Sequence, residues 1–171
     1  QGLLAVIQKP KQEPSHLTAH SFLLLVDQVQ DPGNLGTMIR TADAAGVDAV
    51  LLGAGTVDPF NEKVVRSTQG SLFHLPLYQG ELLPVVDELK QNGWLVVGSA
   101  VDGALDLYRT NIAPGQKLAL IVGNEGQGIS PELLHRTSFN VKIPLWGKAE
   151  SLNVSVACGI LLYHFQFQRL L

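Results

Sequence analysis

The stretch FLLLVDQVQDPGNLGTMIRTADAAGVDAVLL, residues 22–52, contains the unit that decides the predicted fold. Its two ends, Phe22–Val26 and Ala49–Leu52, are continuous apolar runs, which are typical of strands buried on both faces of a sheet. Between them, Asp31–Gly36 is rich in turn-forming residues, and Thr37–Ala45 is predicted to be a helix. Strand, loop, helix and strand in this order predict two parallel strands joined by a right-handed crossover.

The same alternation continues to the end of the chain. Further strands are expected at Leu75–Leu77, Trp94–Ser99, Leu118–Val122 and Val141–Leu145. Further helices are expected to end near Arg66, to span Leu82–Gln91, and to run from about Ser151 to Phe167. Strands that alternate with helices predict an α/β fold: a mainly parallel sheet with helices on both faces, built by one domain of residues 21–171.

Composition limits the classes of protein to which the chain can belong. It has 171 residues, the size of one domain, and 46% of them are hydrophobic. No apolar run reaches the roughly 18 residues that a membrane span needs. The net charge of −3 argues against binding nucleic acid by bulk charge, although a local basic patch stays open. The single cysteine, Cys158, excludes an internal disulfide framework and favours a reducing, cytoplasmic location.

Three polar loops each follow an expected strand: Gln28–Gly36, Gly123–Ile129 and Trp146–Asn153. Ligands of open α/β sheets bind beyond the carboxyl ends of the strands, so we expect these loops to form one shared pocket. Residues in or beside the loops that could carry out polar chemistry are Asn34, Arg40, Glu125, Ser151 and Asn153.

Two of these residues also have simpler explanations. Ser151 has the residue type of a helix N-cap, which would account for it without any catalytic role. Arg40 could be a surface cation or the partner of Asp27 or Asp43, whereas its alternative is a guanidinium aimed at a phosphate or an oxyanion. Asn153 is a poor helix former, so its place beside Ser151 favours a site displayed at a helix start.

Several known types of active site lack their sequence signatures. Gly123–Gly128 is spaced G-x-x-G-x-G, the reverse of the dinucleotide-binding fingerprint. The chain contains neither the phosphate loop of NTPases nor the G-x-S-x-G turn of hydrolases. Its histidines show no metal-ligand spacing, apart from His16 and His20 in a proline-bounded segment. We therefore expect no metal and no classical hydrolase or NTPase chemistry.

Three motifs, in order, resemble those of the SpoU (TrmH-type) RNA 2′-O-ribose methyltransferases of the SPOUT class. They are DPGNLGxxxRTADAAG at residues 31–46, LALIVGNEGxG at residues 118–128 and IPLxxxxxSLNVSVA at residues 143–157. The resemblance implies a deep trefoil knot formed by the C-terminal segment. It also implies a homodimer in which the last helix lies in the interface and Arg40 reaches toward the partner's cofactor.

The cofactor implied by the resemblance is S-adenosylmethionine, bound mainly through backbone groups and apolar side chains. The positions that match its binding site are Ser99, Val122, Gly123, Ile143, Leu145 and Leu152. RNA phosphates would contact the cations Lys63, Arg66, Lys142 and Lys148. Residues 1–20 would be a linker or the remnant of an N-terminal RNA-binding domain.

The implied reaction is methyl transfer to a ribose 2′-hydroxyl of a structured RNA, ribosomal or transfer RNA. The family's arginine at the position of Arg40 is proposed as the base, but arginine side chains keep their proton in proteins. We therefore expect Arg40 to stabilise the forming alkoxide or to hold a phosphate, with the other polar loop residues orienting it. Two alternatives stay open: a SPOUT enzyme that methylates a base, and a cofactor-binding relative without methyl transfer.

Overall fold

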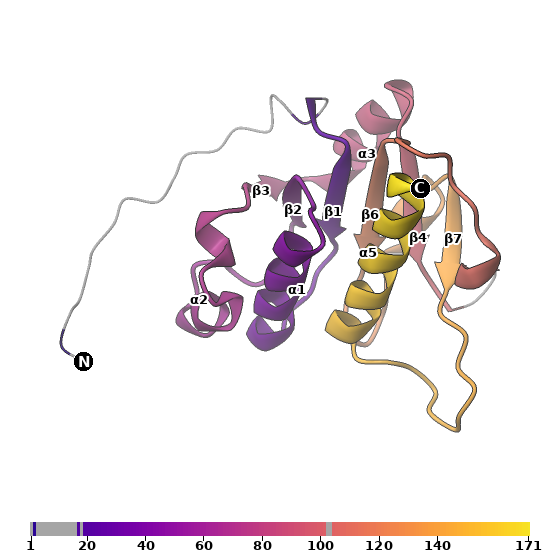
Figure 1. The fold of residues 1–171 in the computed structure, drawn as a ribbon. Helices are drawn as coiled ribbons and strands as arrows, with labels where there is room; N and C mark the ends of the chain where they lie inside the picture. Colours follow the sequence, from indigo (N-terminus) through magenta and orange to yellow (C-terminus); the bar gives the residue numbers. More distant parts are fainter. Residues whose placement is uncertain (1, 3–16, 18, 102–103) are drawn as a thin grey trace.

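A seven-stranded sheet runs through the described part of the chain, which is residues 2, 17, 19–101 and 104–171 of a computed structural model. The strands are β1 (Phe22–Val26), β2 (Ala49–Gly53), β3 (Leu77–Gly80), β4 (Leu95–Ser99), β5 (Leu105–Asp106), β6 (Leu118–Val122) and β7 (Phe139–Lys142). They lie in the order β3-β2-β1-β6-β4-β7-β5, and each of the six pairings is parallel (Figure 1). The predicted parallel pair of β1 and β2 is therefore confirmed.

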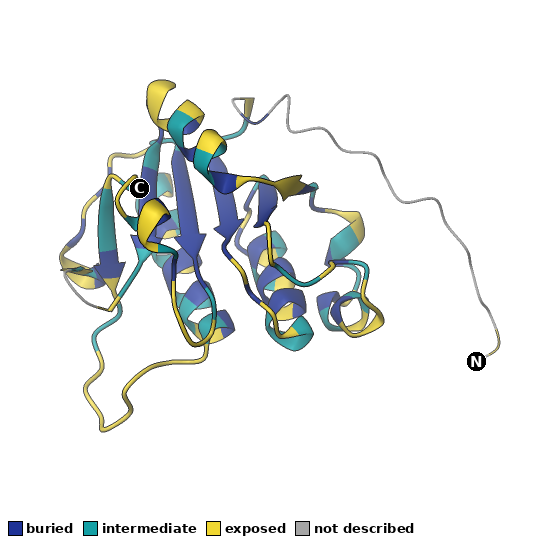
Figure 2. Cartoon of the chain, turned by 180° about the vertical axis from the view of Figure 1, so that it is seen from behind, coloured by how far each residue is buried: buried dark blue, intermediate teal, exposed yellow. Residues whose placement is uncertain are grey.

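Helices cover both faces of the sheet, as predicted. They are α1 (Pro32–Ala44), α2 (Glu62–Thr68), α3 (Leu82–Gln91), α4 (Pro131–Leu134) and α5 (Val154–Leu170), with two 3₁₀ turns, η2 (Ser71–Phe73) and η3 (Leu107–Arg109). One hydrophobic core joins α1 and α5 to the sheet, and a second core joins α3 and α4 to the opposite face (Figures 1 and 2).

The alternation of side chains along β1 explains why its sequence is apolar throughout. Leu24 and Val26 belong to the core beneath α1 and α5, whereas Leu23 and Leu25 belong to the core beneath α3 and α4. All four are fully buried. A strand that faces two helical layers has no exposed position, so it needs a continuous apolar run.

Helix α1 begins earlier than predicted. Residues 31–36 were expected to be a loop, but Asp31 is the N-cap and Pro32 opens the helix. The Asp31 side chain accepts a hydrogen bond from the Asn34 backbone N–H at 2.8 Å. Proline suits this first position, since its fixed φ is helical and it lacks only an N–H that would have had no partner. The expectation of a loop was therefore wrong, and Asn34 lies in the first turn of a helix.

The C-terminal boundaries also differ from the prediction. Strand β7 ends at Lys142 instead of Leu145, since the ladder pairs Ser99 with Val141 and the proline at position 144 has no N–H to continue it. Helix α5 begins at Val154, and its N-cap is Asn153 instead of Ser151. The short strand expected at residues 75–77 lies at residues 77–80, where it pairs with β2.

Three further expectations concern the ends and the threading of the chain. No helix among the described residues is long and apolar enough to span a membrane. The expected linker at residues 1–20 lies outside the described residues, apart from positions 2, 17, 19 and 20. The trefoil knot stays a prediction.

Candidate functional site

The candidate site lies at the carboxyl edge of the sheet, where three segments leave neighbouring strands. They follow β1, β6 and β7 and comprise residues 27–34, 123–130 and 143–153. Helix α1 carries the chain from β1 to β2 on one side, while β6 lies on the other side of β1. Such a reversal of strand order is where open α/β sheets form ligand-binding crevices.

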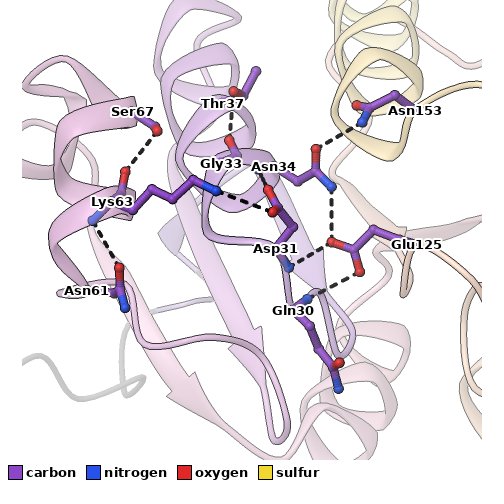
Figure 3. A network of polar contacts seen from close by, with 10 residues as sticks. All are labelled: Gln30, Asp31, Gly33, Asn34, Thr37, Asn61, Lys63, Ser67, Glu125 and Asn153. Carbon is purple, nitrogen blue, oxygen red and sulfur yellow. Dashed lines mark hydrogen bonds and ion pairs between the residues drawn. The ribbon is translucent and has the colours of Figure 1, made fainter.

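A chain of hydrogen bonds joins the three segments (Figure 3). The Asn34 side chain donates from Nδ2 to Oε1 of Glu125 at 3.1 Å. Its Oδ1 accepts a hydrogen bond from Nδ2 of Asn153 at 3.0 Å. Three residues separated by 91 and 119 positions in sequence are thereby in direct contact. The prediction that these loops converge is confirmed for Asn34, Glu125 and Asn153.

Asn153 links the site to the start of α5. Its Oδ1 accepts hydrogen bonds from the backbone N–H groups of Ser155 and Val156 and from the Ser155 hydroxyl. Because Oδ1 is used as the helix cap, only Nδ2 remains to reach Asn34. The orientation of both amides is therefore fixed, with the Asn34 oxygen toward Asn153 and its nitrogen toward Glu125.

Glu125 is a carboxylate held by several donors. Burial opposes its ionisation, but hydrogen bonds from Asn34 and from the backbone N–H groups of Gln30 and Asp31 outweigh burial and lower its pKa. The backbone N–H of Asn34 is the largest influence on Asp31 and lowers the pKa of its carboxyl group, and Lys63 acts in the same direction. Both acids are therefore anionic at neutral pH.

The segment after β6 is closed on itself. Asn124 and Gly128 exchange two backbone hydrogen bonds of 2.9 Å, and the Asn124 side chain donates to the Gln28 carbonyl at 2.9 Å. At Gly123 a Cβ atom would lie 2.1 Å from the backbone carbon of Gly128 and 2.2 Å from the nitrogen of Ile129. Only glycine fits there, since the loop folds directly back over this position.

Four of the six expected cofactor-binding positions lie together at the ends of β6, β4 and β7. Val122 and Gly123 leave β6, which pairs with β4, and Ser99 ends β4. Ser99 pairs with Val141, two residues before Ile143. The remaining two, Leu145 and Leu152, lie on the segment after β7, and both side chains are exposed.

The backbone of residues 144–152 forms no hydrogen bond with any described residue. This segment extends away from the sheet and is exposed at residues 145–152 (Figures 1 and 2). Free backbone groups next to the exposed leucines Leu145 and Leu152 are what a planar, partly polar ring such as adenine requires. The residues present therefore fit the expected cofactor.

Comparison with known proteins identifies the family of this chain. The model of the SpoU rRNA methylase family matches residues 21–163. The chain belongs to this family. It is 51% identical over 166 residues to the Bacillus subtilis (strain 168) 23S rRNA (guanosine(2553)-2′-O)-methyltransferase RlmP. The match covers 97% of this chain but 65% of that relative.

Solved structures of SpoU proteins have the same fold. The SpoU methyltransferase AviRb from Streptomyces viridochromogenes has a TM-score of 0.80 at 32% identity, over 88% of this chain and 60% of that one. An AdoMet-bound rRNA methyltransferase from Sinorhizobium meliloti has a TM-score of 0.79 at 36% identity, over 84% and 55%. The chain thus spans a little over half the length of these proteins.

Two of the SpoU motif residues lie apart from the hydrogen-bonded chain. Arg40 is exposed on α1, six residues after Asn34, which places it about 9 Å further along the helix and roughly 120° around it. It has no hydrogen bond or ion pair with any described residue, so of its two simpler explanations the salt bridge to Asp27 or Asp43 is not formed and the surface cation stays open. Ser151 is likewise exposed and without such a partner.

The four expected RNA-binding cations fall into two pairs. Lys63 contacts Asp31 at 3.6 Å, and Arg66 pairs with Glu62 one helical turn away, so α2 neutralises part of its own charge. Lys142 and Lys148 are exposed, and neither forms an ion pair with a described residue. The lysines around the β7 segment are therefore the more available cations.

Sequence reasoning passed over some polar residues of this site. Asp31, the cap of α1, stands before proline, a combination that signals a helix start. Asn124 holds the β6 loop in shape, and no local pattern indicates that role.

Among the described residues, no group of three or more His, Cys, Asp or Glu could hold a metal ion. Cys158 is fully buried, which raises its pKa to about 12 and keeps it a thiol.

Proposed function

We propose that this chain transfers the methyl group of S-adenosylmethionine to a ribose 2′-hydroxyl of ribosomal RNA. The observation that carries the proposal is the contact chain Glu125–Asn34–Asn153, because it joins one residue from each of the three SpoU motifs. The names of the relatives support the same reaction, since one is a 23S rRNA 2′-O-methyltransferase and another is an AdoMet-bound rRNA methyltransferase.

S-adenosylmethionine, when bound, supplies a sulfonium-linked methyl group that a ribose 2′-oxygen can take in line as it loses its proton. Val122, Gly123 and Ile143 would hold it at the strand ends, and Leu145 and Leu152 would cover its adenine. Arg40 would stabilise the negative charge that develops on the 2′-oxygen, since its guanidinium keeps its own proton. The proton would pass to a phosphate or to water. Asn34, Glu125 and Asn153 would fix the loops around the reacting atoms, and Ser151 would contact the substrate.

A homodimer would complete the site. Helix α5 buries Cys158, Leu161 and Phe165 against the sheet. Its other side exposes large apolar side chains at Val156, Tyr163, Phe167 and Leu170. These four positions recur at helical spacing and form a stripe that a second copy could cover. Arg40, which faces away from Asn34 in its own chain, would then reach the partner's cofactor.

The test is methyl transfer from tritiated S-adenosylmethionine to ribosomal RNA isolated from a strain that lacks this gene. Nucleoside mass spectrometry would identify the product, since a 2′-O-methyl group stays with the sugar when the base is released. We expect one 2′-O-methylnucleoside. A methylated base would replace the ribose assignment, and cofactor binding by calorimetry without transfer to any RNA would reject the activity.

A further inference from the structure

An exposed pair of aromatic rings stands apart from the residues already assigned. Trp146, on the segment after β7, is 85% exposed. Its ring lies against that of Tyr108 in η3, with the centroids 6.1 Å apart and the planes within 9° of parallel. The two rings are parallel but offset, so Tyr108 contacts only part of the indole and most of its surface is open to solvent. An exposed indole has an apolar surface that water solvates poorly.

The supporting ring is itself anchored to the core. Tyr108 meets His164 edge-on at 5.7 Å, and His164 meets the buried Phe165 edge-on at 5.4 Å. The Tyr108 backbone N–H donates to Asp106 at 2.9 Å. Near the end of α5, Gln168 donates to the Thr110 carbonyl at 2.7 Å. Tyr108 is thus held in place although it lies in a single 3₁₀ turn.

Cations accompany the aromatic pair in the sequence. Arg109 directly follows Tyr108, and Lys148 follows Trp146 by two residues; both are exposed. Lys142 lies opposite Asp106 in the register of β7 with β5, next to the turn that carries Tyr108. Among the described residues that flank the pair in the sequence or in this register, these three cations stand beside two carboxylates, Asp106 and Glu150, whereas the whole chain has a net charge of −3. Aromatic rings beside cations are the elements with which proteins bind unpaired nucleic acid.

We propose that the open face of Trp146, backed by Tyr108, is a stacking platform for an unpaired base of the RNA substrate. The proposal rests on the proposed function, because it assigns part of the RNA to this surface. Seven residues separate Trp146 from Asn153, a span of at most about 25 Å. One bound RNA can therefore reach both the platform and the Glu125–Asn34–Asn153 chain. Stacking tolerates any base, so the platform recognises an unpaired nucleotide and not a sequence.

The fluorescence of Trp146 tests the proposal directly. The chain has two tryptophans, and Trp94 is 3% exposed, with an Nε1–H that donates no hydrogen bond to any described residue. Trp94→Phe therefore leaves Trp146 as the only indole without breaking a hydrogen bond. A short single-stranded oligoribonucleotide should quench its emission saturably, and the same sequence annealed into a duplex should quench it less.

Three results would overturn the proposal. The first is the absence of quenching by single-stranded RNA. The second is quenching by S-adenosylmethionine alone, which would place the adenine on Trp146. The third is a blue-shifted emission that acrylamide does not quench in the free protein, which would place Trp146 in a contact between subunits.

Substitution separates stacking from general apolar contact. Trp146→Leu should weaken RNA affinity roughly five- to 150-fold, whereas Trp146→Tyr should retain most of it. Trp146→Leu should leave kcat, the rate at saturating RNA, unchanged and should raise the KM for RNA. The reason is that stacking contributes equally before and during the reaction. An equal loss of RNA affinity in Trp146→Leu and Trp146→Tyr, or a fall in kcat alone, would contradict the stacking platform. Quenching by RNA without any methyl transfer by the unsubstituted chain would reject the proposed function and leave the platform standing.

Discussion

The loop after β6 and the loop after β7 lie at the same edge of the sheet, yet their internal structures are opposite. Residues 123–130 fold back on themselves through the Asn124–Gly128 hydrogen bonds and leave no room for a Cβ at Gly123. Residues 144–152 have no backbone hydrogen bond to any described residue, and residues 145–152 are exposed.

This difference indicates how the site is divided. The β6 loop and Asn34 are held by the chain itself and form a preorganised half. The polar groups of the β7 loop and of Arg40 have no partner among the described residues and are exposed to solvent, so they are available to a cofactor, an RNA or a second copy. A preorganised half reduces the entropy cost of binding, while an open half lets the ligand supply the missing contacts.

The largest effect is expected from adding one methyl group at Gly123 in the β6 loop, compared with the same addition in the β7 loop. Gly123→Ala forces a Cβ into the backbone of residues 128 and 129 and should destabilise the protein by about 3 kcal/mol in urea unfolding. Gly147→Ala is the matched control on the open loop, where a Cβ would meet no atom within 4 Å. Its unfolding free energy should stay within about 0.5 kcal/mol of the unsubstituted chain. Similar values for the two variants would remove the contrast between the loops.

Arg40 tests the open half through activity. Arg40→Ala should lower kcat for methyl transfer about 100-fold, since an electrostatic contact to the developing oxyanion is lost. Its unfolding free energy should hardly change, because Arg40 is exposed and has no partner among the described residues. Arg40→Lys keeps the positive charge but lacks the planar guanidinium, so its kcat should lie between those of Arg40→Ala and the unsubstituted chain. Undiminished transfer by Arg40→Ala with intact cofactor binding would remove Arg40 from the mechanism.

The sequence predicted the architecture better than the boundaries near the site. Apolar runs such as Phe22–Val26 and Leu118–Val122 coincide with β1 and β6, because a strand buried on both faces has no polar position. The start of α1 was available in the sequence as aspartate before proline, but glycine and asparagine in the next turn suggested a loop. Ser151 and Asn153 are both capping types, and the structure distinguishes them: Asn153 caps α5 through its Oδ1 and contacts Asn34 through its Nδ2.

Contacts between distant segments could not be read from local patterns. The hydrogen bond from Asn153 to Asn34 spans 119 residues, and it exists only because α5 packs beside α1. The stacking of Trp146 on Tyr108 likewise depends on where β5 and β7 pair. Family motifs pointed to three loops that the structure brings together, whereas packing decided which side chains meet.

A moderate effect is expected where the two halves join. Asn153→Ala removes the cap of α5 and should cost about 1 kcal/mol of unfolding free energy. Asn153→Asp keeps an oxygen for the helix N–H groups but loses the donor to Asn34, so its stability should be close to that of the unsubstituted chain. Methyl transfer should fall in both variants, because neither side chain can donate a hydrogen bond to the Asn34 oxygen and the link between the first and third segments is lost. Full activity of Asn153→Asp would show that the contact with Asn34 is dispensable.

The smallest effect is expected from Glu125, and it depends on pH. The folded-state pKa of this carboxyl lies below its ordinary value of 4.5, so its ionisation stabilises the fold above pH 4.5. This contribution is lost as the pH falls from 4.5 through the lower, folded-state pKa. Glu125→Gln should therefore be less stable than the unsubstituted chain at pH 7, by less than about 1 kcal/mol because the site is exposed, and the difference should shrink in acid.

Glu150→Gln provides the matched control for the loss of this charge. Glu150 lies on the open β7 loop and has no hydrogen bond or ion pair with any described residue. Its substitution should leave the unfolding free energy at pH 7, measured by urea unfolding, closer to that of the unsubstituted chain than Glu125→Gln does. A loss of stability at pH 7 as large for Glu150→Gln as for Glu125→Gln would mean that net charge, and not the hydrogen bonds to Asn34 and the α1 start, sets the effect. The β6 loop would then owe its stability to its backbone and to the Asn124 side chain, and Glu125 would be free to turn toward a ligand.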